Sequence, residues 1–407
     1  MNAPIVIVGA GLAGSKAAET LRAEGDDSDV VLIGAEPERP YERPALSKDY
    51  LAGRVDRESV YVHEASWYES HAVDLRVATT VVAVDRTVSE VQLSTGERLA
   101  YHRLLLATGS QPRTLDVPGS TASGIRTLRT LPDSDQLREA IATASDVVVV
   151  GAGWIGLEVA AAARAAGCTV TIVETADLPL VRILGPQIAA VFAALHRDNG
   201  VDLRLRTGVS RFTTAAGHVT GVELSDGTSV AAQLVVVGVG ISPRVELAAG
   251  AGLDVADGVT TDASLQTSDP RIYAAGDVAA AFHPLLGRRI RVEHWANALH
   301  QPQAAARAML GQDVSYDRLP YFYTDQFDLG MEYTGYAMPG EYDDVIIRGD
   351  LDAREFVAFW TSGGRVAAGM NVNVWDVTDQ IKALIRSRAV VDPVALADPG
   401  TPLESLS

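Results

Sequence analysis

The sequence predicts an α/β fold in which one parallel-sheet unit is inserted into another and an α+β domain follows. Residues 5–14 (IVIVGAGLAG) and 147–156 (VVVVGAGWIG) share four apolar residues, the motif G-x-G-x-x-G and an Ala-rich continuation. Such short apolar runs are typical of buried parallel strands, and the continuation favours a helix. From Pro320 apolar and polar residues alternate, as in an antiparallel sheet. These patterns predict two Rossmann-like units and a C-terminal α+β domain.

The two units have the same predicted order of strand, helix and strand. Their predicted elements span residues 5–8, 15–23 and 30–33 in the first unit, and 147–150, 157–166 and 169–173 in the second. An acid follows each second strand, because Glu36 lies 27 residues after Gly9 and Glu174 lies 23 residues after Gly151. A dinucleotide fold places its ribose-binding carboxylate at a spacing of about 20 residues.

Three further buried strands are predicted at 104–109, 234–237 and 272–277, each ending close to a glycine or acid where a ligand can approach. The second unit therefore lies between two halves of the first. The predicted domains are 1–111 with 244–319, then 112–243, and then 320–407. The last stretch, from about Asp392, is rich in Pro and small residues and is expected to be an extended tail.

Composition excludes several classes of function. The chain has 407 residues and a formal net charge of −18, which disfavours nucleic acid and anionic lipid as partners. Its one cysteine, Cys168, permits no intrachain disulfide, no CxxC pair and no four-thiolate cluster, and is expected to be a buried core residue. We expect no membrane insertion and a cytoplasmic location. We also expect no metal site, because no histidines show the spacing of metal ligands.

The glycine motifs carry the strongest functional signal. The first two glycines let the backbone turn and approach a pyrophosphate, while the helix N-terminus supplies unpaired amides and a positive dipole end. A single copy also fits an ordinary tight turn. Two copies in register with strand, helix and acid predict two dinucleotide-binding domains.

The chain resembles the flavin-dependent ferredoxin reductases, relatives of putidaredoxin reductase and of the reductases of aromatic-ring dioxygenases, within the glutathione-reductase fold. The resemblance extends to about Arg388. The segments that carry it are 43–48 (RPALSK), 128–131 (LRTL), 266–270 (QTSDP), the segment around Asp277, and Asp325-Gln326.

The resemblance implies that the first unit binds FAD and the inserted unit binds NAD(P)H. The residues implied for FAD are Gly9, Gly11, Ala13, Gly14, Ala35 or Glu36, Arg43, Lys48, the Val81 backbone, Ala107, Thr108, Gly109, Arg129, Gly276, Asp277, Glu293, His294 and Trp295. The residues implied for NADH are Gly151, Gly153, Trp154, Ile155, Gly156, Glu158, Glu174, Gly238, Val239 and Gly240. Two alternatives stay open: Asp277 as a helix N-cap, and His294 as a packing residue.

Glu174 is expected to decide between the two nicotinamide coenzymes. A carboxylate at this position binds the two free ribose hydroxyls and repels a 2′-phosphate, so NADH is preferred over NADPH. Arg182, eight residues on, is a cation that would soften this preference.

Lys48 and Glu158 resemble the lysine and glutamate that meet beside the flavin N5 in this fold, and both are expected to be catalytic. A cation at N5 stabilises the reduced, anionic flavin, and a paired carboxylate holds the lysine in place. The alternatives are a solvated helix start for Lys48 and a helix-surface position for Glu158.

The implied activity is that of a ferredoxin–NAD(+) reductase. Hydride passes from NADH to FAD, and single electrons pass to a small iron-sulfur ferredoxin that feeds a haem mono-oxygenase or a ring dioxygenase. Arg288, Arg289 and Arg291 would dock an acidic ferredoxin, or else form a solvated hairpin edge. The protein is expected to be a monomer or a homodimer.

The resemblance weakens in the C-terminal domain. Tyr321 and Tyr323 stand where better-known members carry tryptophans, and Trp295 and the 370–376 segment are closer to relatives of apoptosis-inducing factor. Two alternatives therefore remain: an NADH-sensing flavoprotein that acts by binding partners, and an NADH:quinone or dye reductase.

Overall fold

The computed structural model describes residues 3–406 and divides into two compact units. Unit 1 contains the residues up to Glu42, together with Arg57–Gln111 and Ile241–Pro320. Unit 2 contains Arg43–Asp56, Pro112–Gly240 and the chain from Tyr321 onward.

Unit 1 is built on a five-stranded sheet in which all neighbouring strands are parallel. Its strand order is β20 (Ile272–Ala274), β7 (Arg103–Leu106), β1 (Ile5–Val8), β2 (Val30–Ile33) and β3 (Val73–Arg76). Ile5 and Ile7 share a core cluster with side chains of α1 (Leu12–Ala23) and α7 (Trp295–Met309), while Val6 and Val8 belong to another cluster. Successive side chains of β1 thus enter cores on opposite faces of the sheet, and both faces are buried, as expected for a parallel sheet.

Smaller elements complete unit 1. A meander of β4 (Val81–Asp85), β5 (Glu90–Leu93) and β6 (Arg98–Ala100) contributes Val81, Val84 and Val91 to the cluster that contains Val6 and Val8. Unit 1 also contains α2 (Ala65–Ser70), α6 (Glu246–Gly250), and a sheet of β18 (Val255–Ala256), β19 (Gly258–Thr261), β21 (Ala279–His283) and β22 (Arg288–Arg291).

Unit 2 contains the second parallel sheet. Its order is β12 (Asp202–Leu205), β11 (Thr169–Glu174), β10 (Asp146–Val150), β16 (Leu234–Val237) and β9 (Ile125–Arg126). The helices of this segment are α3 (Leu131–Thr143), α4 (Trp154–Ala165) and α5 (Val181–Asp198), and a three-stranded sheet follows with β13 (Val209–Ala215), β14 (His218–Leu224) and β15 (Ser229–Ala231). Both parallel sheets confirm the predicted fold class.

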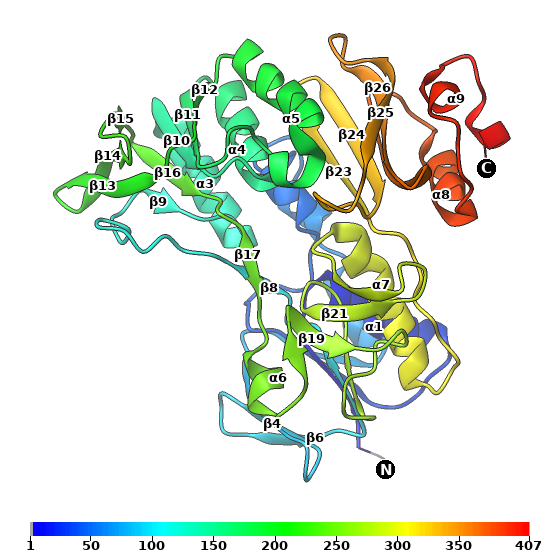
Figure 1. The fold of residues 1–407 in the computed structure, drawn as a ribbon. Coiled ribbons are helices and arrows are strands. Elements are labelled where there is room, and N and C mark those ends of the chain that lie inside the picture. The colour runs from blue at the N-terminus through cyan, green and yellow to red at the C-terminus, as the bar shows by residue number, and fades with distance from the viewer. Residues whose placement is uncertain (1–2, 407) are drawn as a thin grey trace. The chain divides into compact units, whose positions relative to one another are not determined.

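The C-terminal part of unit 2 is the predicted antiparallel sheet (Figure 1). Its order is β23 (Tyr321–Gln326), β24 (Leu329–Gly335), β27 (Arg365–Val372), β26 (Glu355–Ser362) and β25 (Asp344–Asp350). Helix α8 (Thr378–Ser387) packs on it, and Gly369 of β27 faces the Ile381 side chain closely enough that a Cβ would lie 2.5 Å from it.

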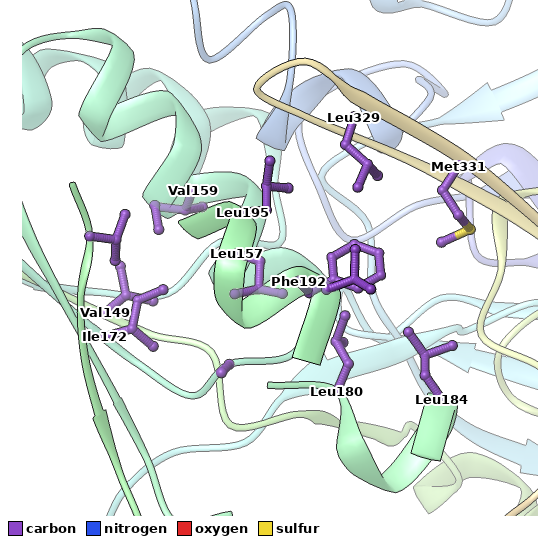
Figure 2. Close-up of a cluster of buried hydrophobic side chains, with 14 of the residues drawn as sticks. Val149, Leu157, Val159, Ile172, Leu180, Leu184, Phe192, Leu195, Leu329 and Met331 are labelled. Carbon is purple, nitrogen blue, oxygen red and sulfur yellow. The ribbon is translucent and has the colours of Figure 1, made fainter. Parts of the chain in front are cut away.

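One core joins the second parallel sheet to the antiparallel sheet. Figure 2 shows Leu157 and Phe192, from α4 and α5, in the same cluster as Leu329 and Met331 of β24. The predicted domains 112–243 and 320–407 thus share one core, although each has its own sheet. Cys168 belongs to this cluster and is 2% exposed, which confirms its expected core position.

Residues 43–56 lie in unit 2, whereas the prediction grouped them with the first domain. Leu51 belongs to the unit 2 core, and the hydroxyl of Ser134 on α3 donates to the Leu46 carbonyl at 2.8 Å. These contacts with residues far along the chain anchor the segment, and no local sequence pattern reveals them.

Two other expectations are corrected. Helices α1 and α4 begin at Leu12 and Trp154, three residues before the predicted starts, because the third glycine of each motif lies within the first helical turn. The predicted extended tail instead forms α9 (Pro393–Ala397), which Asp392 caps by accepting a hydrogen bond from the Val394 amide at 3.0 Å, and a final 3₁₀ turn. Arg348 also donates to the carbonyls of Asp398 and Thr401 at 2.7 and 2.6 Å.

Candidate functional site

The first glycine motif leaves one open position at the start of α1. Gly9 has φ +116°, and a Cβ there would lie 2.1 Å from the Ala107 carbonyl oxygen. At Gly14 a Cβ would lie 2.0 Å from the Gly9 carbonyl oxygen, so both positions require glycine for packing. At Gly11, the helix N-cap, a Cβ would meet nothing within 4 Å. The middle glycine therefore borders open space, where a ligand phosphate can approach.

The second motif repeats this arrangement in unit 2. Gly151 has φ +101°, and its Cβ would lie 2.4 Å from the Gly238 carbonyl oxygen. A Cβ at Gly156 would lie 2.1 Å from the Gly151 carbonyl oxygen, while one at Gly153 would meet nothing within 4 Å. Both helices thus begin at an open glycine, and in the described part of the chain no side chain caps either N-terminus. Their first-turn amides fit a pyrophosphate group.

The two acids expected at the ribose positions differ in how they are held. Glu174, at the end of β11, accepts hydrogen bonds from the amides of Ala152 and Ala176 at 2.8 and 2.9 Å. Its carboxylate is therefore fixed against the loop of the second glycine motif. Glu36 accepts a hydrogen bond from the Tyr41 hydroxyl, and the neighbouring Ala35 is exposed.

Two expected FAD segments, 107–109 and 276–277, lie against the first motif. Gly276 has φ +81°, and a Cβ there would approach the Ala13 methyl group at 3.1 Å. The Gly276 amide donates to Gln301 Oε1 at 2.8 Å, and Gln301 lies on α7. Thr108 donates to the Arg244 carbonyl at 2.8 Å. Asp277 is half-buried directly after this contact with the start of α1.

The expected segment 293–295 forms the start of α7. His294 is the N-cap, and burial lowers the pKa of its imidazole to about 4, which keeps the ring neutral at neutral pH. Burial raises the pKa of Glu293, although its ion pair with Arg291 opposes this shift. The Trp295 indole donates to Glu42 at 3.1 Å. Val81, at the start of β4, is buried.

Lys48 and Glu158 meet within unit 2, as expected from the resemblance. Lys48 Nζ lies 2.7 Å from Glu158 Oε1 and 5.4 Å from the centre of the Tyr323 ring. The two side chains are 14% and 3% exposed, so neither the solvated helix start nor the helix-surface alternative describes them. The carboxylate also accepts hydrogen bonds from the hydroxyls of Ser47 and Thr324, the latter at 2.6 Å.

Ser47 and Thr324 had no predicted role. Thr324 follows Tyr321-Phe322-Tyr323 in the alternating pattern of β23, on the buried face shared with Phe322. A polar residue at an inward position of a strand was the available signal, because a buried hydroxyl requires a partner.

Arg43 and Arg129 also come together in unit 2. The Arg43 guanidinium donates to the Arg129 carbonyl, and the Arg129 amide donates to Asp133 at 3.1 Å. The other residues expected at FAD lie in unit 1 with the first glycine motif, apart from Lys48. Those expected at NADH all lie in unit 2, where Ile155 in the first turn of α4 is 44% exposed.

The expected basic patch is smaller than the sequence suggested. Arg291 is 10% exposed and pairs with Asp257 at 3.1 Å and with Glu293, which removes it from an exposed docking surface. Its charge is compensated because β22 turns it toward these acids. Arg289 alternates to the exposed side of the same strand, and Arg288 is half-buried.

Comparison with known proteins covers the whole chain. The sequence model of the family described as pyridine nucleotide-disulphide oxidoreductase matches residues 3–302, and that described as reductase C-terminal matches residues 321–407. The anthranilate 1,2-dioxygenase system ferredoxin–NAD(+) reductase component of Burkholderia cepacia is 41% identical over 99% of this chain and 98% of its own length. Putidaredoxin reductase CamA of Pseudomonas putida is 39% identical over 100% and 97%.

Solved structures agree over the full length. The reductase in the covalent putidaredoxin reductase–putidaredoxin complex is 39% identical with a TM-score of 0.96, covering 100% of this chain and 98% of that one. The ferredoxin reductase for the CYP199A2 system from Rhodopseudomonas palustris is 36% identical with a TM-score of 0.95, and each chain is covered completely.

Proposed function

Because the chain belongs to the pyridine nucleotide-disulphide oxidoreductase family, we propose that it is an NADH-dependent ferredoxin reductase that supplies electrons to an oxygenase system. Full-length similarity to the ferredoxin reductase components of dioxygenase and cytochrome systems is the observation that carries this conclusion. The duplicated glycine motif supports it, since the reaction needs two dinucleotide sites.

The first site is assigned to FAD and the second to NADH. Both open glycines, Gly11 and Gly153, border space at an uncapped helix N-terminus, as a diphosphate requires. In the second site Glu174 is fixed by two backbone amides, so its carboxylate is positioned for a ribose diol and against a 2′-phosphate. NADH is therefore the preferred coenzyme. Arg182, the cation expected to soften this preference, is exposed at the start of α5.

Lys48 and Glu158 are assigned to the flavin chemistry. A bound FAD would supply the conversion from two-electron to one-electron transfer that an iron-sulfur acceptor needs. Lys48 supplies a positive charge that stabilises electron density gained by the flavin, and Glu158 holds its ammonium group in one position.

The electron acceptor is proposed to be a small iron-sulfur ferredoxin. The similar chain in the putidaredoxin complex supports this class of partner. Ferredoxins of this kind are acidic and this chain carries a net charge of −18, so docking requires a local basic patch. Arg289 and Arg288 remain the proposed docking residues.

Arg289→Glu should lower kcat/KM for ferredoxin at low salt and leave dye reduction unchanged. Arg211→Glu is the control, at an exposed position of β13 in unit 2 where the arginine pairs with Glu223 at 2.7 Å.

Anaerobic mixing of the FAD-loaded protein with NADH or NADPH tests the assignment directly. Loss of flavin absorbance is followed by stopped flow. Reduction by NADH should proceed at about 10 s⁻¹ or faster, and reduction by NADPH should be much slower. Slow reduction by NADH, with a stable long-wavelength absorbance band, would contradict the proposal and favour an NADH-sensing binding protein.

A second arm separates ferredoxin from small acceptors. Steady-state turnover is measured with a two-iron ferredoxin and, separately, with a quinone. Higher kcat/KM for the ferredoxin supports the proposal. Fast turnover that needs no protein acceptor would instead indicate a quinone or dye reductase.

A further inference from the structure

A chain of buried polar side chains leads away from Glu158. Thr324 Oγ1 lies 2.6 Å from Glu158 Oε1, Gln326 Nε2 lies 3.2 Å from Thr324 Oγ1, and His196 Nε2 lies 2.9 Å from Gln326 Oε1. Thr324, Gln326 and His196 are 0%, 1% and 0% exposed. All of these residues belong to unit 2, from α4, β23 and α5. Such groups are expensive to bury, so their arrangement requires a reason.

The chemistry of the groups fixes the direction of every hydrogen bond. A carboxylate only accepts, so the Thr324 hydroxyl donates to Glu158. Thr324 Oγ1 must then accept from the Gln326 amide nitrogen, which leaves Gln326 Oε1 to accept from His196. His196 therefore carries its proton on Nε2, and its Nδ1 has no hydrogen-bond partner in the described part of the chain. Burial lowers the pKa of His196, which is consistent with a neutral ring.

Within residues 3–406, Gln326 is the one hydrogen-bond partner of the His196 ring. Its ring meets Phe327 edge to face, with ring centres 5.2 Å apart. Its neighbours on α5, Phe192 and Leu195, belong to the apolar core. Aligned donors in such a low-dielectric core polarise one another, so each bond in the chain strengthens the next.

We infer that Thr324, Gln326 and His196 are positioning residues that fix the Glu158 carboxylate and thereby the Lys48 ammonium group. This inference rests on the proposed function of Lys48 and Glu158. Glu158 Oε1 accepts from both Lys48 and Thr324, so losing the hydroxyl leaves that oxygen with Lys48 as its one remaining partner of these two. The lysine end would then gain freedom, and its charge would be less well placed.

Thr324→Val tests this hydrogen-bond chain, because valine keeps the shape of the threonine side chain and removes its hydroxyl. In the FAD-loaded protein, reduction by NADH should slow at least about tenfold, close to the effect of losing one hydrogen bond to a charged group. The flavin midpoint potential should become more negative, because the reduced flavin loses part of its cationic stabilisation. Thr324→Ser, which restores a hydroxyl, should restore both values.

Thr361→Val is the matched control. Thr361 is a buried threonine of the same sheet and is 5% exposed. Its hydroxyl lies 3.5 Å from the Asp344 carbonyl and, within residues 3–406, forms no hydrogen bond with Glu158 or Lys48. It should change neither the rate nor the potential. An equal loss in Thr361→Val, or an unchanged potential in Thr324→Val, would show a merely structural role and overturn the inference.

A spectroscopic arm does not depend on catalysis. The ¹⁵N resonances of His196, assigned with His196→Gln, should show a neutral ring protonated at Nε2. A ring protonated at Nδ1 would reverse the last bond of the chain and overturn the inference, even in an active enzyme. If the unmodified protein is reduced slowly by NADH but shows the expected His196 signal, the result counts against the proposed function and leaves the hydrogen-bond chain from Glu158 to His196 supported.

Discussion

At the scale of single residues, the two acids Glu158 and Glu174 differ in their hydrogen-bond partners and in their proposed roles. Glu158 is buried and accepts from three side chains, which fits a role in holding Lys48. Glu174 is half-buried and accepts from backbone amides beside the second glycine motif. The difference in partners, more than the shared carboxylate chemistry, separates the two roles.

Lys48→Met should slow flavin reduction by NADH about tenfold or more, because one charge is removed from the reaction while the volume is kept. FAD content should stay unchanged. Stopped-flow reduction measures the effect, with Lys382→Met as the control, since Lys382 forms an exposed ion pair with Asp379. A rate equal to that of the unmodified protein would remove Lys48 from the catalytic group.

Glu174→Gln should lower the preference for NADH over NADPH about tenfold, because the repulsion of a 2′-phosphate is lost together with a charged ribose acceptor. The ratio of kcat/KM values for the two coenzymes measures it. Asp177→Asn removes an exposed charge three residues away and should leave the ratio unchanged. A similar fall in both variants would indicate a general charge effect and no specific ribose contact.

At the scale of elements, the start of each first helix separates folding from ligand binding. The outer glycines of each motif pack against backbone, whereas the middle glycine borders open space. A side chain at the middle position should therefore interfere with a ligand without disturbing the fold.

Gly153→Val should raise KM for NADH about tenfold or more and leave bound FAD unchanged, because the side chain occupies the phosphate position of one site alone. Gly11→Val should do the opposite and release FAD. Flavin content after purification and NADH titration distinguish the two variants. If Gly153→Val released FAD and Gly11→Val did not, the assignment of the sites would be reversed.

At the scale of the whole molecule, burial lowers the pKa of three histidines in the described chain, His63, His196 and His294, the last to about 4. In an unfolded chain a histidine pKa is about 6.5, so below that pH the unfolded state binds more protons than the folded state. The stability from these groups is complete above about pH 6.5 and is lost as pH falls toward the folded values.

Urea unfolding at pH 7.5, 6.0 and 5.0 should therefore show decreasing stability, by up to about 1.4 kcal/mol per pH unit for each fully shifted histidine. His196→Gln should reduce the slope, whereas His218→Gln, at an exposed position, should not. Constant stability across this range would contradict burial of neutral histidines.

Also at the scale of the whole molecule, no helix in residues 3–406 is long and apolar enough to cross a membrane.

The sequence predicted the elements that depend on local pattern. Strands β1, β2 and β16 have the predicted bounds, because runs of four apolar residues are typical of strands that are buried on both faces of a parallel sheet. It missed the starts of α1 and α4, where the close contact of Gly14 with Gly9, and of Gly156 with Gly151, allows a glycine inside the first turn.

By itself, the sequence determined the duplicated nucleotide-binding units and the antiparallel sheet, because glycine spacing and residue alternation are local consequences of backbone geometry. Tertiary structure alone decided the partners of Glu158, the loss of Arg291 from the basic patch and the membership of 43–56 in unit 2. The partners of Glu158 lie more than a hundred positions away along the chain, and Asp257 lies 34 positions before Arg291. Contacts of this kind leave no periodic pattern in the sequence, so they can be identified only in the folded structure.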